Sequence, residues 1–375
     1  MRGSWQLVPF GDAVTDESGG NVKTLQSDYL PAGRFAVVDQ GKALVAGFVN
    51  DESFLCGAEL PVIVFGDHTR CFKYVDFPFC MGADGVKVLR PRAGIDPKFL
   101  YFYLRQLRLP DGGYDRHFKY LKRSAIPLPP LPEQQRIADV LDRVEALRAK
   151  RRAALAQLDG LTQAIFLEMF GGAAARMGDW PMMKLQDCLA SPLRNGLSPS
   201  TAGRFSSKVL TLSAITGPAF DSTAWKACSF QTALPVSSLV DATDFLICRG
   251  NGSVRLVGKG QYPSCSMEGV AFPDTMIAAR ISPFLLDRAF FQHVWNSGGV
   301  RRQLEASART TNGTFKINQT AVECVTLEVP PLPLQQDFAR RVAAVEKLKA
   351  AHRASLGELD ALFASLQHRA FRGEL

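Results

Sequence analysis

Residues 126–171 read IPLPPLPEQQRIADVLDRVEALRAKRRAALAQLDGLTQAIFLEMFG, and this stretch determines the expected fold. A proline cluster opens it, and no further Gly or Pro follows until Gly160. This spacing of apolar and small residues predicts a long helix whose seam packs along another helix. About 38 residues at a rise of ~1.5 Å each would form a rod of roughly 57 Å. The seam residues expected from three- and four-residue steps are Ile137, Val140, Val144, Leu147, Ala154, Leu158, Leu161 and Ile165.

A second copy of this stretch lies 201 residues further along the chain. Residues 327–373 read LEVPPLPLQQDFARRVAAVEKLKAAHRASLGELDALFASLQHRAFRG and align with the first copy without a gap. The PLP and QQ elements recur at the same register, and even the polar seam position Arg151 is matched by His352. Chance similarity between two amphipathic helices does not explain a shared proline–glutamine motif. The sequence therefore indicates a duplication, and the second helix is the expected partner of the first.

Length and composition favour a protein with more than one domain. A chain of 375 residues with 46% hydrophobic content can bury two sizeable cores. No signal peptide and no run of 18 apolar residues is present, so no membrane span is expected. Eight cysteines without a CxxC pair indicate reduced thiols of a cytoplasmic protein. Five histidines without ligand spacing predict no metal site.

The net charge of +8 is concentrated in the segments outside the two long helices. Residues 172–326 hold 15 basic and 10 acidic side chains, and residues 1–125 hold 16 and 14. Each helical stretch is close to neutral. A modest positive excess on the non-helical segments is consistent with a surface that binds a polyanion.

The first non-helical segment contains several short β-branched runs and one helix. Strands are expected over residues 35–38, 43–49, 60–65 and 86–89. A helix is expected over residues 96–108, with Asp96 as its cap and Pro97 in its first turn. A glycine-containing loop, residues 111–119, then leads to the proline cluster.

The second non-helical segment repeats this order. Trp180 corresponds to Trp5 and Asp187 to Asp12. Strands are expected over residues 209–212, 245–248 and 276–281, and a helix over residues 284–304. A glycine-bearing loop, residues 310–316, precedes the second proline cluster.

This order predicts an α+β fold with two αβ domains in tandem, each followed by a long helix. The expected parts are a first recognition domain over 1–125, a first spacer helix over 126–171, a second recognition domain over 172–326 and a second spacer helix over 327–375. The second helix can pair with the first only by running back, so we expect an antiparallel coiled coil with pseudo-two-fold symmetry. Two different domains separated in this way would suit two different DNA half-sites about one helical turn, roughly 34–36 Å, apart.

The PPLPEQQ-type motif before a long helix, present twice and each time after an αβ segment, resembles the specificity subunit of Type I restriction–modification systems. The resemblance covers essentially the whole chain. It implies two target recognition domains that read an asymmetric bipartite site in double-stranded DNA, and a coiled coil that sets the spacing and docks two methyltransferase subunits. An endonuclease/translocase subunit would join for cleavage, and the chain itself would have no catalytic residues and no cofactor. One departure is Leu334, which stands where the first copy has Glu133 and removes an acid that favours the helix dipole.

Basic, amide and aromatic side chains in the loops are the candidate DNA contacts. Arginine is expected to read guanine and asparagine to read adenine, whereas other donors hold phosphates. The candidates in the first domain are His68, Thr69, Arg70, Lys73, Tyr114, Arg116, His117, Lys119, Lys122 and Arg123, and those in the second are Arg249, Asn251, Arg255, Lys259, Arg309, Thr310, Asn312, Lys316 and Asn318. For the loop at residues 65–73, a solvated turn is an equally good interpretation. Residues 249–260 are expected to form a glycine-rich strand pair, since they fit a phosphate-binding P-loop poorly.

Catalysis is the competing class of function. The chain lacks both the glycine-rich cofactor loop and the Asn/Asp-Pro-Pro-aromatic motif that a methyltransferase needs, and it lacks a convincing acidic nuclease cluster. A DNA-binding scaffold without enzymatic partners is the alternative that stays open. On the long helices, Leu155 and Phe166 are expected to lie off the seam, where a methyltransferase could dock.

Overall fold

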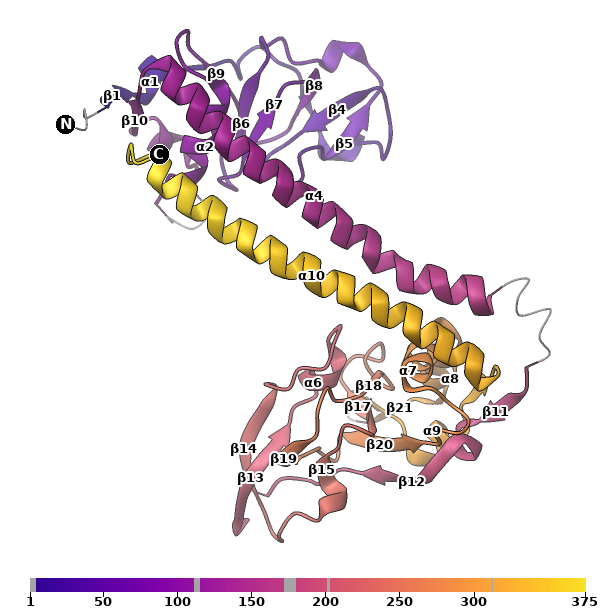
Figure 1. The fold of residues 1–375 in the computed structure, drawn as a ribbon. Coiled ribbons are helices and arrows are strands. Elements are labelled where there is room, and N and C mark those ends of the chain that lie inside the picture. Colours follow the sequence, from indigo (N-terminus) through magenta and orange to yellow (C-terminus); the bar gives the residue numbers. More distant parts are fainter. Residues whose placement is uncertain (1–4, 111–114, 172–179, 201–202, 312) are drawn as a thin grey trace. The chain divides into compact units, whose positions relative to one another are not determined.

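The computed structural model describes residues 5–110, 115–171, 180–200, 203–311 and 313–375. It contains two compact units: unit 1 is formed by residues 1–155 with 351–375, and unit 2 by residues 156–350. Each unit combines a globular segment with part of both long helices, and each is described by itself. Figure 1 labels their elements. The sheets and the paired long helices confirm the α+β fold class expected from the sequence.

Unit 1 contains two four-stranded sheets and a two-stranded ribbon. The sheet β2-β9-β6-β7 is antiparallel, whereas in the sheet β3-β8-β4-β5 strand β8 runs parallel to both neighbours. The ribbon pairs β1 with β10, which opens and closes the globular segment. The run expected over residues 43–49 is a strand only at its end. The elements are β1 (Gln6–Pro9), α1 (Phe10–Ala13), β2 (Val14–Asp16), β3 (Lys23–Thr24), β4 (Phe35–Val38), β5 (Gly47–Val49), β6 (Val62–Gly66), β7 (Phe72–Val75), β8 (Phe79–Gly82), β9 (Val86–Pro91), α2 (Pro97–Gln106), α3 (Phe118–Leu121) and β10 (Ala125–Leu128).

Helix α2 packs between the antiparallel sheet and the long helix α4 (Leu131–Phe170). Asp96 caps α2 as expected, since its carboxylate accepts a hydrogen bond of 2.8 Å from the Phe99 amide. Leu100 lies in the core cluster that contains Ile63 of the sheet, whereas Phe99 lies in the cluster that contains Ile137 of α4. Because it has two apolar faces, α2 joins the sheet to the helix pair.

Unit 2 repeats this plan with more elements. Its sheets are β12-β20-β16-β18, β14-β13-β19-β15 and β17-β22-β21, and its ribbon pairs β11 with β23. The ribbon again opens and closes the globular segment. The elements are β11 (Met182–Lys184), β12 (Leu189–Asn195), β13 (Phe205–Leu210), α6 (Ser213–Thr216), β14 (Trp225–Phe230), β15 (Leu239–Val240), β16 (Phe245–Cys248), β17 (Gly250–Asn251), β18 (Gly260–Gln261), β19 (Met267–Ala271), β20 (Met276–Ile281), α7 (Arg288–Trp295), α8 (Gly298–Ser307), β21 (Arg309–Thr311), β22 (Thr314–Lys316), α9 (Gln319–Glu323), β23 (Thr326–Glu328) and α10 (Leu332–Ala370).

The single helix expected over residues 284–304 is wrong, because this segment forms the two helices α7 and α8. Asn296 ends α7: its side-chain amide donates to Gln292 O at 2.9 Å and to Gly260 O at 2.8 Å. Two glycines follow at 298 and 299, and they weaken helix continuation. Phe284, at the expected start, lies outside both helices and is 86% exposed.

Both long helices begin inside the proline motif. Helix α4 starts at Leu131 and α10 at Leu332, whereas the expected spacer segments started at 126 and 327. The residues before each helix form strands β10 and β23 instead. Proline explains the difference, since it restricts the residue before it to extended backbone but is tolerated in the first turn of a helix.

The first glutamine of each QQ pair fastens the long helix to its globular segment. In unit 1, Gln134 is 2% exposed; its Oε1 accepts a hydrogen bond from the Asp96 amide at 2.9 Å. Its Nε2 donates to Pro129 O at 2.9 Å and to Gly94 O at 3.3 Å. The glutamine therefore binds the capping residue of α2 and the start of α4 at once.

Unit 2 contains the same arrangement. Gln335 is fully buried; its Oε1 accepts from the Asp287 amide at 2.9 Å, and Asp287 caps α7. Its Nε2 donates to Pro330 O at 2.7 Å and to Leu285 O at 2.9 Å. Leu334, the departure from the motif, packs against the core of unit 2, whereas Glu133 pairs with an arginine one turn later.

The seam of the helix pair follows four- and three-residue steps that differ in part from the expected ones. In unit 1, Ile137, Leu141 and Val144 of α4 cluster with Phe363 and Ala370 of α10. The N-terminal part of α4 thus meets the C-terminal part of α10. The complete set of seam positions in α4 is 137, 141, 144, 148, 151, 155, 158, 162, 165 and 169, and the same positions shifted by 201 form the seam of α10.

In unit 2 the C-terminal part of α4 meets the N-terminal part of α10. Ile165 and Met169 lie in one cluster with Phe338 and Val342. The pairing is therefore antiparallel, as expected. The glutamate–arginine contact between Glu168 and Arg341, at 3.8 Å, lies beside this seam.

Six expectations about the faces of α4 are wrong. Val140 and Ala154 were expected in the seam but lie outside the set of seam positions. Leu147 and Leu161 were expected in the seam but are 50% and 39% exposed. Leu155 was expected off the seam but occupies a seam position. Phe166 was expected on an outer face but packs inward, with its ring 5.7 Å from that of Phe338. The interrupted pattern caused these errors, because arginines at 148 and 151 hide the correct register.

A charged layer occupies the middle of the seam at equivalent positions. In unit 1, Arg148 donates to Asp360 and to Glu145, both at 2.6 Å. In unit 2, Lys349 lies 3.1 Å from both Asp159 and Glu346. Arg148 and Glu145 correspond to Lys349 and Glu346 at a forward shift of 201. Asp360 corresponds to Asp159 at the same shift in reverse. The duplication therefore preserved a complete ion network.

The two residues at the midpoint of the pairing contact each other. Arg151 Nη1 and His352 Nδ1 are 3.1 Å apart, and the two residues occupy the same position of the repeat. Such a contact is expected only where the midpoint of one copy meets that of the other. Within the described part of the chain, no helix is sufficiently long and apolar to span a membrane.

We predict that Gln335→Ala destabilises unit 2 by about 3 kcal/mol, because three buried or part-buried backbone groups lose their hydrogen-bond partner. The adjacent Gln336 is exposed, so Gln336→Ala is the matched control and should change stability by less than ~0.5 kcal/mol. Urea unfolding followed by tryptophan fluorescence and circular dichroism measures both. Equal midpoints for the two variants would contradict the role given to the buried glutamine.

Candidate nucleic-acid interface

The loop expected over residues 310–316 forms a β-hairpin in unit 2. Strands β21 and β22 pair with each other, and β22 also pairs with β17. Gly313 has φ 74° and makes the tight turn. Arg309 lies directly opposite Lys316, and both are exposed. Two like charges opposite each other are destabilising in a sheet, which favours an anionic ligand at this hairpin.

A basic cleft of about 560 Å³ lies beside the hairpin. Arg249, Arg309, Lys316 and Asn318, four of the expected contact residues, line it together. No Asp or Glu is among the described residues that line this cleft. Arg249 also donates to Asp274 O at 3.2 Å, which fixes its position at the cleft wall.

Asn318 of the cleft also has a structural role, and other expected residues of unit 2 lie elsewhere. Asn318 caps α9 through a 2.9 Å bond from the Ala321 amide to its side-chain oxygen. Thr310 is exposed on β21, and Arg255 is exposed on the loop after β17. Asn312 lies outside the described residues.

The glycine-rich strand pair expected over residues 249–260 is wrong. Strand β17 pairs with β22, and β18 pairs with β16, so the two strands do not pair with each other. Lys259 donates to Thr216 O at 2.6 Å, and the Asn251 side chain accepts from the Ser253 amide at 3.0 Å. These two polar side chains bind the protein's own backbone.

In unit 1, helix α3 presents a basic surface. Arg116, Lys119, Lys122 and Arg123 are exposed on α3 or beside it. Asp115 accepts hydrogen bonds from Lys119 at 2.9 Å and from Tyr120 at 3.0 Å, and these hold the pKa of its carboxyl at about 2, below its ordinary value. The carboxylate thus stays ionised and fixes one lysine of the surface.

An aromatic ring supports two further cations of this surface. The Nζ atoms of Lys122 and Lys87 lie 4.7 Å and 4.9 Å from the centroid of the Phe118 ring. Such cation–π contacts orient the lysines without neutralising them. Lys87 was not expected from the sequence, since it lies on strand β9, distant along the chain. Tyr114 lies outside the described residues.

Two expected contact residues are buried and serve the interior. His117 is 1% exposed, and its Nδ1 lies 2.9 Å from Asp67 O. Lys73 is 5% exposed and donates to Asp39 O at 2.7 Å. Neither side chain can reach a ligand at the surface in this arrangement, so neither belongs to the interface proposed below.

The turn after β6 carries the remaining expected residues. His68 is half-buried, whereas Thr69 and Arg70 are exposed. Arg70 has φ 60°, the only positive value among the described non-glycine residues. It lines a cleft with Arg105 and Arg108, which the sequence reasoning missed. The duplication could have identified Arg108, because Arg108 corresponds to the expected contact Arg309 at the shift of 201.

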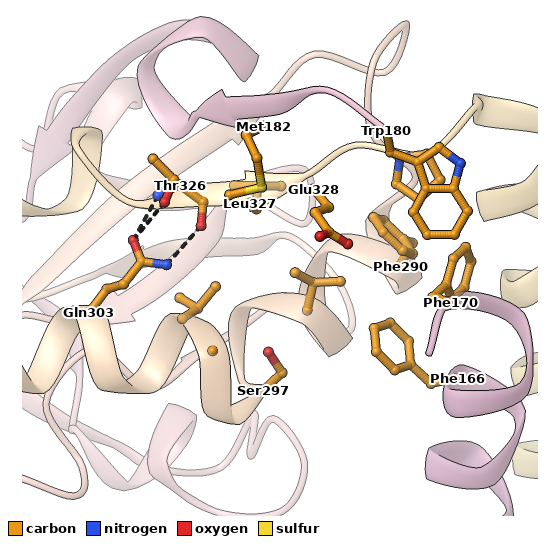
Figure 2. A pocket seen from close by; sticks show the side chains of 14 residues that line it. Phe166, Phe170, Trp180, Met182, Phe290, Ser297, Gln303, Thr326, Leu327 and Glu328 are labelled. Carbon is orange, nitrogen blue, oxygen red and sulfur yellow. Dashed lines mark hydrogen bonds between the residues drawn. The ribbon is translucent and has the colours of Figure 1, made fainter. Parts of the chain in front are cut away.

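Unit 2 also contains an apolar pocket of about 250 Å³ (Figure 2). Phe166, Phe170, Trp180 and Phe290 line one end, and at the other Gln303 donates to Thr326 O at 2.8 Å. Figure 2 shows the four rings gathered at one side. Among the described residues that line it, Glu328 is the single carboxylate and no nucleophile is paired with a base, so this lining does not resemble an active site.

The position equivalent to Val294 of this pocket carries a larger side chain in unit 1. Counted from the capping aspartates, Val294 corresponds to Tyr103. The Tyr103 ring lies 5.3 Å from that of Phe371, and its hydroxyl donates to Ala125 O at 3.0 Å. The pocket thus marks a packing difference between the two units. The described residues also contain no cluster of three potential metal ligands.

Comparison with known proteins finds similarity to one family. Residues 61–157 match the family described as Type I restriction modification DNA specificity domain. The chain is 27% identical to the EcoKI specificity subunit of Escherichia coli K12, over 99% of this chain and 89% of that protein.

Two solved structures share the fold. The S subunit of a Type I restriction–modification system from M. genitalium aligns with a TM-score of 0.64 and 14% identity, covering 98% of this chain and 96% of that one. A chain from a structural study of complex assembly and conformational transition in the type I R-M system aligns with a TM-score of 0.55 and 17% identity, covering 99% and 98%.

We predict that Lys316→Ala weakens DNA binding but leaves the protein's stability unchanged or higher by about 0.5 kcal/mol, because it removes one of two directly opposed charges. The slope of log K against log salt should fall in magnitude by about 0.9, the value for one lost phosphate contact. Lys184→Ala, which removes an exposed lysine of β11, is the control. Fluorescence anisotropy with a labelled duplex measures affinity, and an unchanged slope in the Lys316 variant would refute the contact.

Proposed function

Because the chain belongs to the specificity-subunit family of Type I restriction–modification systems, we propose that it reads an asymmetric bipartite sequence in double-stranded DNA and docks two methyltransferase subunits. As a specificity subunit it is not an enzyme, since the catalytic activities lie in other subunits. The observation that carries the proposal is the duplicated fold: each unit repeats the same ribbon, sheets and glutamine-fastened helix, but the two basic surfaces differ.

Each unit would read one half-site. In unit 2 the proposed contacts come from the hairpin and its cleft, and in unit 1 from α3 and the turn after β6. Because the hairpin of unit 2 and helix α3 of unit 1 present different side chains, the two half-sites should differ in sequence. The proposed residues are Thr69, Arg70, Lys87, Arg116, Lys119, Lys122 and Arg123 in unit 1, and Arg249, Arg255, Arg309, Thr310 and Lys316 in unit 2.

The helix pair would set the length of the spacer between the half-sites. Its charged layer and its seam repeat at a shift of 201, so each globular segment is attached to equivalent parts of the long helices. A spacer defined by helix length changes in steps of one heptad, about 10 Å, when seven residues are removed from each helix.

Methyltransferase docking is proposed for the flank of the helix pair that the globular segments leave uncovered. In unit 1, Lys98 of α2 pairs with Asp142 at 2.7 Å, and Gln367 donates to Phe102 O at 3.1 Å, so α2 covers one flank of the seam. Leu147 and Leu362 lie on the other flank and are 50% and 46% exposed.

Unit 2 has the equivalent pair. Leu348 and Leu161 are the residues related to Leu147 and Leu362 by the shift of 201, and they are 52% and 39% exposed. Exposed leucines at the same positions of a duplicated helix support two copies of one partner, each presenting an apolar helical face.

Further parts of the proposal follow from the family. An endonuclease/translocase subunit would join the complex for cleavage, and the complex would work in the cytoplasm, where its DNA is. A DNA-binding scaffold without enzymatic partners is the alternative. The neighbouring genes distinguish the specificity subunit from the scaffold, because adjacent methyltransferase and helicase–nuclease genes favour the specificity subunit.

Co-expression with the neighbouring methyltransferase tests the central proposal. A stable assembly with two methyltransferase copies should form, and methylome sequencing of the host should reveal methylation within one asymmetric bipartite motif. A chain that stays alone, with no bipartite motif methylated, would exclude the proposed function.

We predict that deleting residues 148–154 together with 349–355 shortens the recognised spacer by about three base pairs, because seven residues at ~1.5 Å match three steps of 3.4 Å. The two segments lie opposite each other around the Arg151–His352 contact, and the deletion preserves the heptad register. Both half-sites should stay the same in methylome sequencing. Changed half-sites with an unchanged spacer would contradict the spacer role.

We predict that Leu147→Glu combined with Leu362→Glu reduces the bound methyltransferase copies from two to one. Two buried charges would oppose docking on unit 1 and leave unit 2 intact. The control is Ala351→Glu combined with Ser365→Glu, which adds the same charges at exposed positions of α10. Mass photometry of the complexes counts the copies; two copies in both variants would refute this docking surface.

A further inference from the structure

Unit 1 contains a cationic notch in which Arg70 meets three surface cations that the sequence did not predict as contacts, Lys42, Arg105 and Arg108. It consists of two adjoining clefts of about 410 Å³ and 270 Å³ that share Arg70, Phe72 and Arg105. Arg108 lines the first cleft, and Lys42 and the buried Lys73 line the second. No Asp or Glu is among the described lining residues of either cleft, so four surface cations from three separate segments converge on one place.

Polar contacts fasten the walls of the notch to each other. Lys73 Nζ donates to Asp39 O at 2.7 Å and lies 3.3 Å from Asp39 Oδ1, which anchors the loop that carries Lys42. The Thr69 hydroxyl donates to Gln40 O, which joins that loop to the turn that carries Arg70. These contacts hold Lys42 and Arg70 on neighbouring walls before any ligand arrives.

Arg105 forms the third wall and is also held in place. Its guanidinium carbon lies 5.2 Å from the Tyr101 ring centroid and 5.9 Å from that of Phe363. Its Nη1 lies 3.5 Å from Glu145 Oε2. Glu145 also binds Arg148 at 2.6 Å, so Arg105 shares this carboxylate with a seam residue.

The duplication provides independent support. Helix α2 ends at Gln106 and α8 ends at Ser307, which are related by the shift of 201, and the arginine two residues later lines a cleft in each unit. In unit 2 this arginine, Arg309, belongs to the basic cleft beside the hairpin. The same place in both units therefore collects cations, although the other lining residues differ.

We propose that the notch formed by Lys42, Arg70, Arg105 and Arg108 binds a phosphate of the DNA backbone beside the half-site read by unit 1. A phosphodiester offers the concentrated anionic oxygens that several arginines can bind together, and such contacts fix the register of a reader without carrying sequence information. Lys73 acts as a positioning residue, since it holds the wall that carries Lys42. The proposal rests on the proposed DNA-reading function.

The test uses the complete chain in complex with its methyltransferase subunits and a labelled duplex that contains the methylated motif. Lys42→Gln and Arg108→Gln should each weaken binding about tenfold. Each should also reduce the magnitude of the salt slope by about 0.9. Arg92→Gln, which removes an exposed arginine of the same unit, is the matched control and should change neither quantity.

A second arm tests the positioning role. Lys73→Met should weaken binding with a salt slope reduced like that of Lys42→Gln, because the wall that carries Lys42 loses its anchor, and Lys73→Arg should restore both quantities. Thermal unfolding of each variant verifies that the unit is folded. Relative affinity for altered half-sites should be the same in every notch variant, because a phosphate contact carries no sequence information.

The outcomes separate this proposal from the function on which it rests. A wild-type complex without preference for any bipartite motif would refute the proposed function. A wild-type complex that binds its motif, with Lys42→Gln and Arg108→Gln both matching Arg92→Gln in affinity and salt slope, would refute the notch alone.

Discussion

The hydrogen bonds of one buried glutamine in each unit hold the architecture together. Gln134 and Gln335 each bind the amide of a helix-capping aspartate and the carbonyl of the motif's first proline pair. Those carbonyls and amides lie just before the starts of helices, where the helix itself provides no hydrogen-bond partner. A glutamine side chain has an acceptor oxygen and a donor NH2 group, so it can bind both kinds of group at once. The glutamine adds hydrogen bonds to the apolar contacts between the long helix and its globular segment, such as that between Ile137 and Phe99 in unit 1.

Because of this link, one part of each unit attaches the globular segment and another part is free to vary in sequence. The globular segment is fixed to one flank of the helix pair, and the loops distant from the glutamine are left to vary. This explains why the shared motif is nearly identical in the two copies, whereas the surfaces that we propose for DNA are a hairpin in one unit and a short helix in the other. Recognition surfaces can change while the fastening stays the same.

The sequence predicted the duplication, the order of the elements and the antiparallel pairing, because these depend on strong patterns such as PPLP, QQ and the shift of 201. It failed where a single side chain decides the outcome. The Asn296 side chain ends a helix that composition alone would continue, and the arginines at 148 and 151 hide the seam register, so that Leu147 was misplaced. For contact residues, residue type alone cannot distinguish an exposed lysine such as Lys316 from Lys73, whose ammonium binds a backbone carbonyl inside the fold. The notch was missed because its cations come from segments far apart in the chain.

The composition of unit 1 also has a consequence for biosynthesis. Its core includes Phe363 and Ala370 from the last helical turns of the chain, packed with Phe99 and Ile137 from the first half. A ribosome makes the N-terminal part first, so these apolar surfaces stay without their partner until residues 351–375 have left the exit tunnel. Unit 2 lies entirely between residues 156 and 350 and can close earlier. The part of the protein that is synthesised first is therefore the last to finish folding, and a chain that loses its final 25 residues would leave unit 1 with an uncovered apolar face.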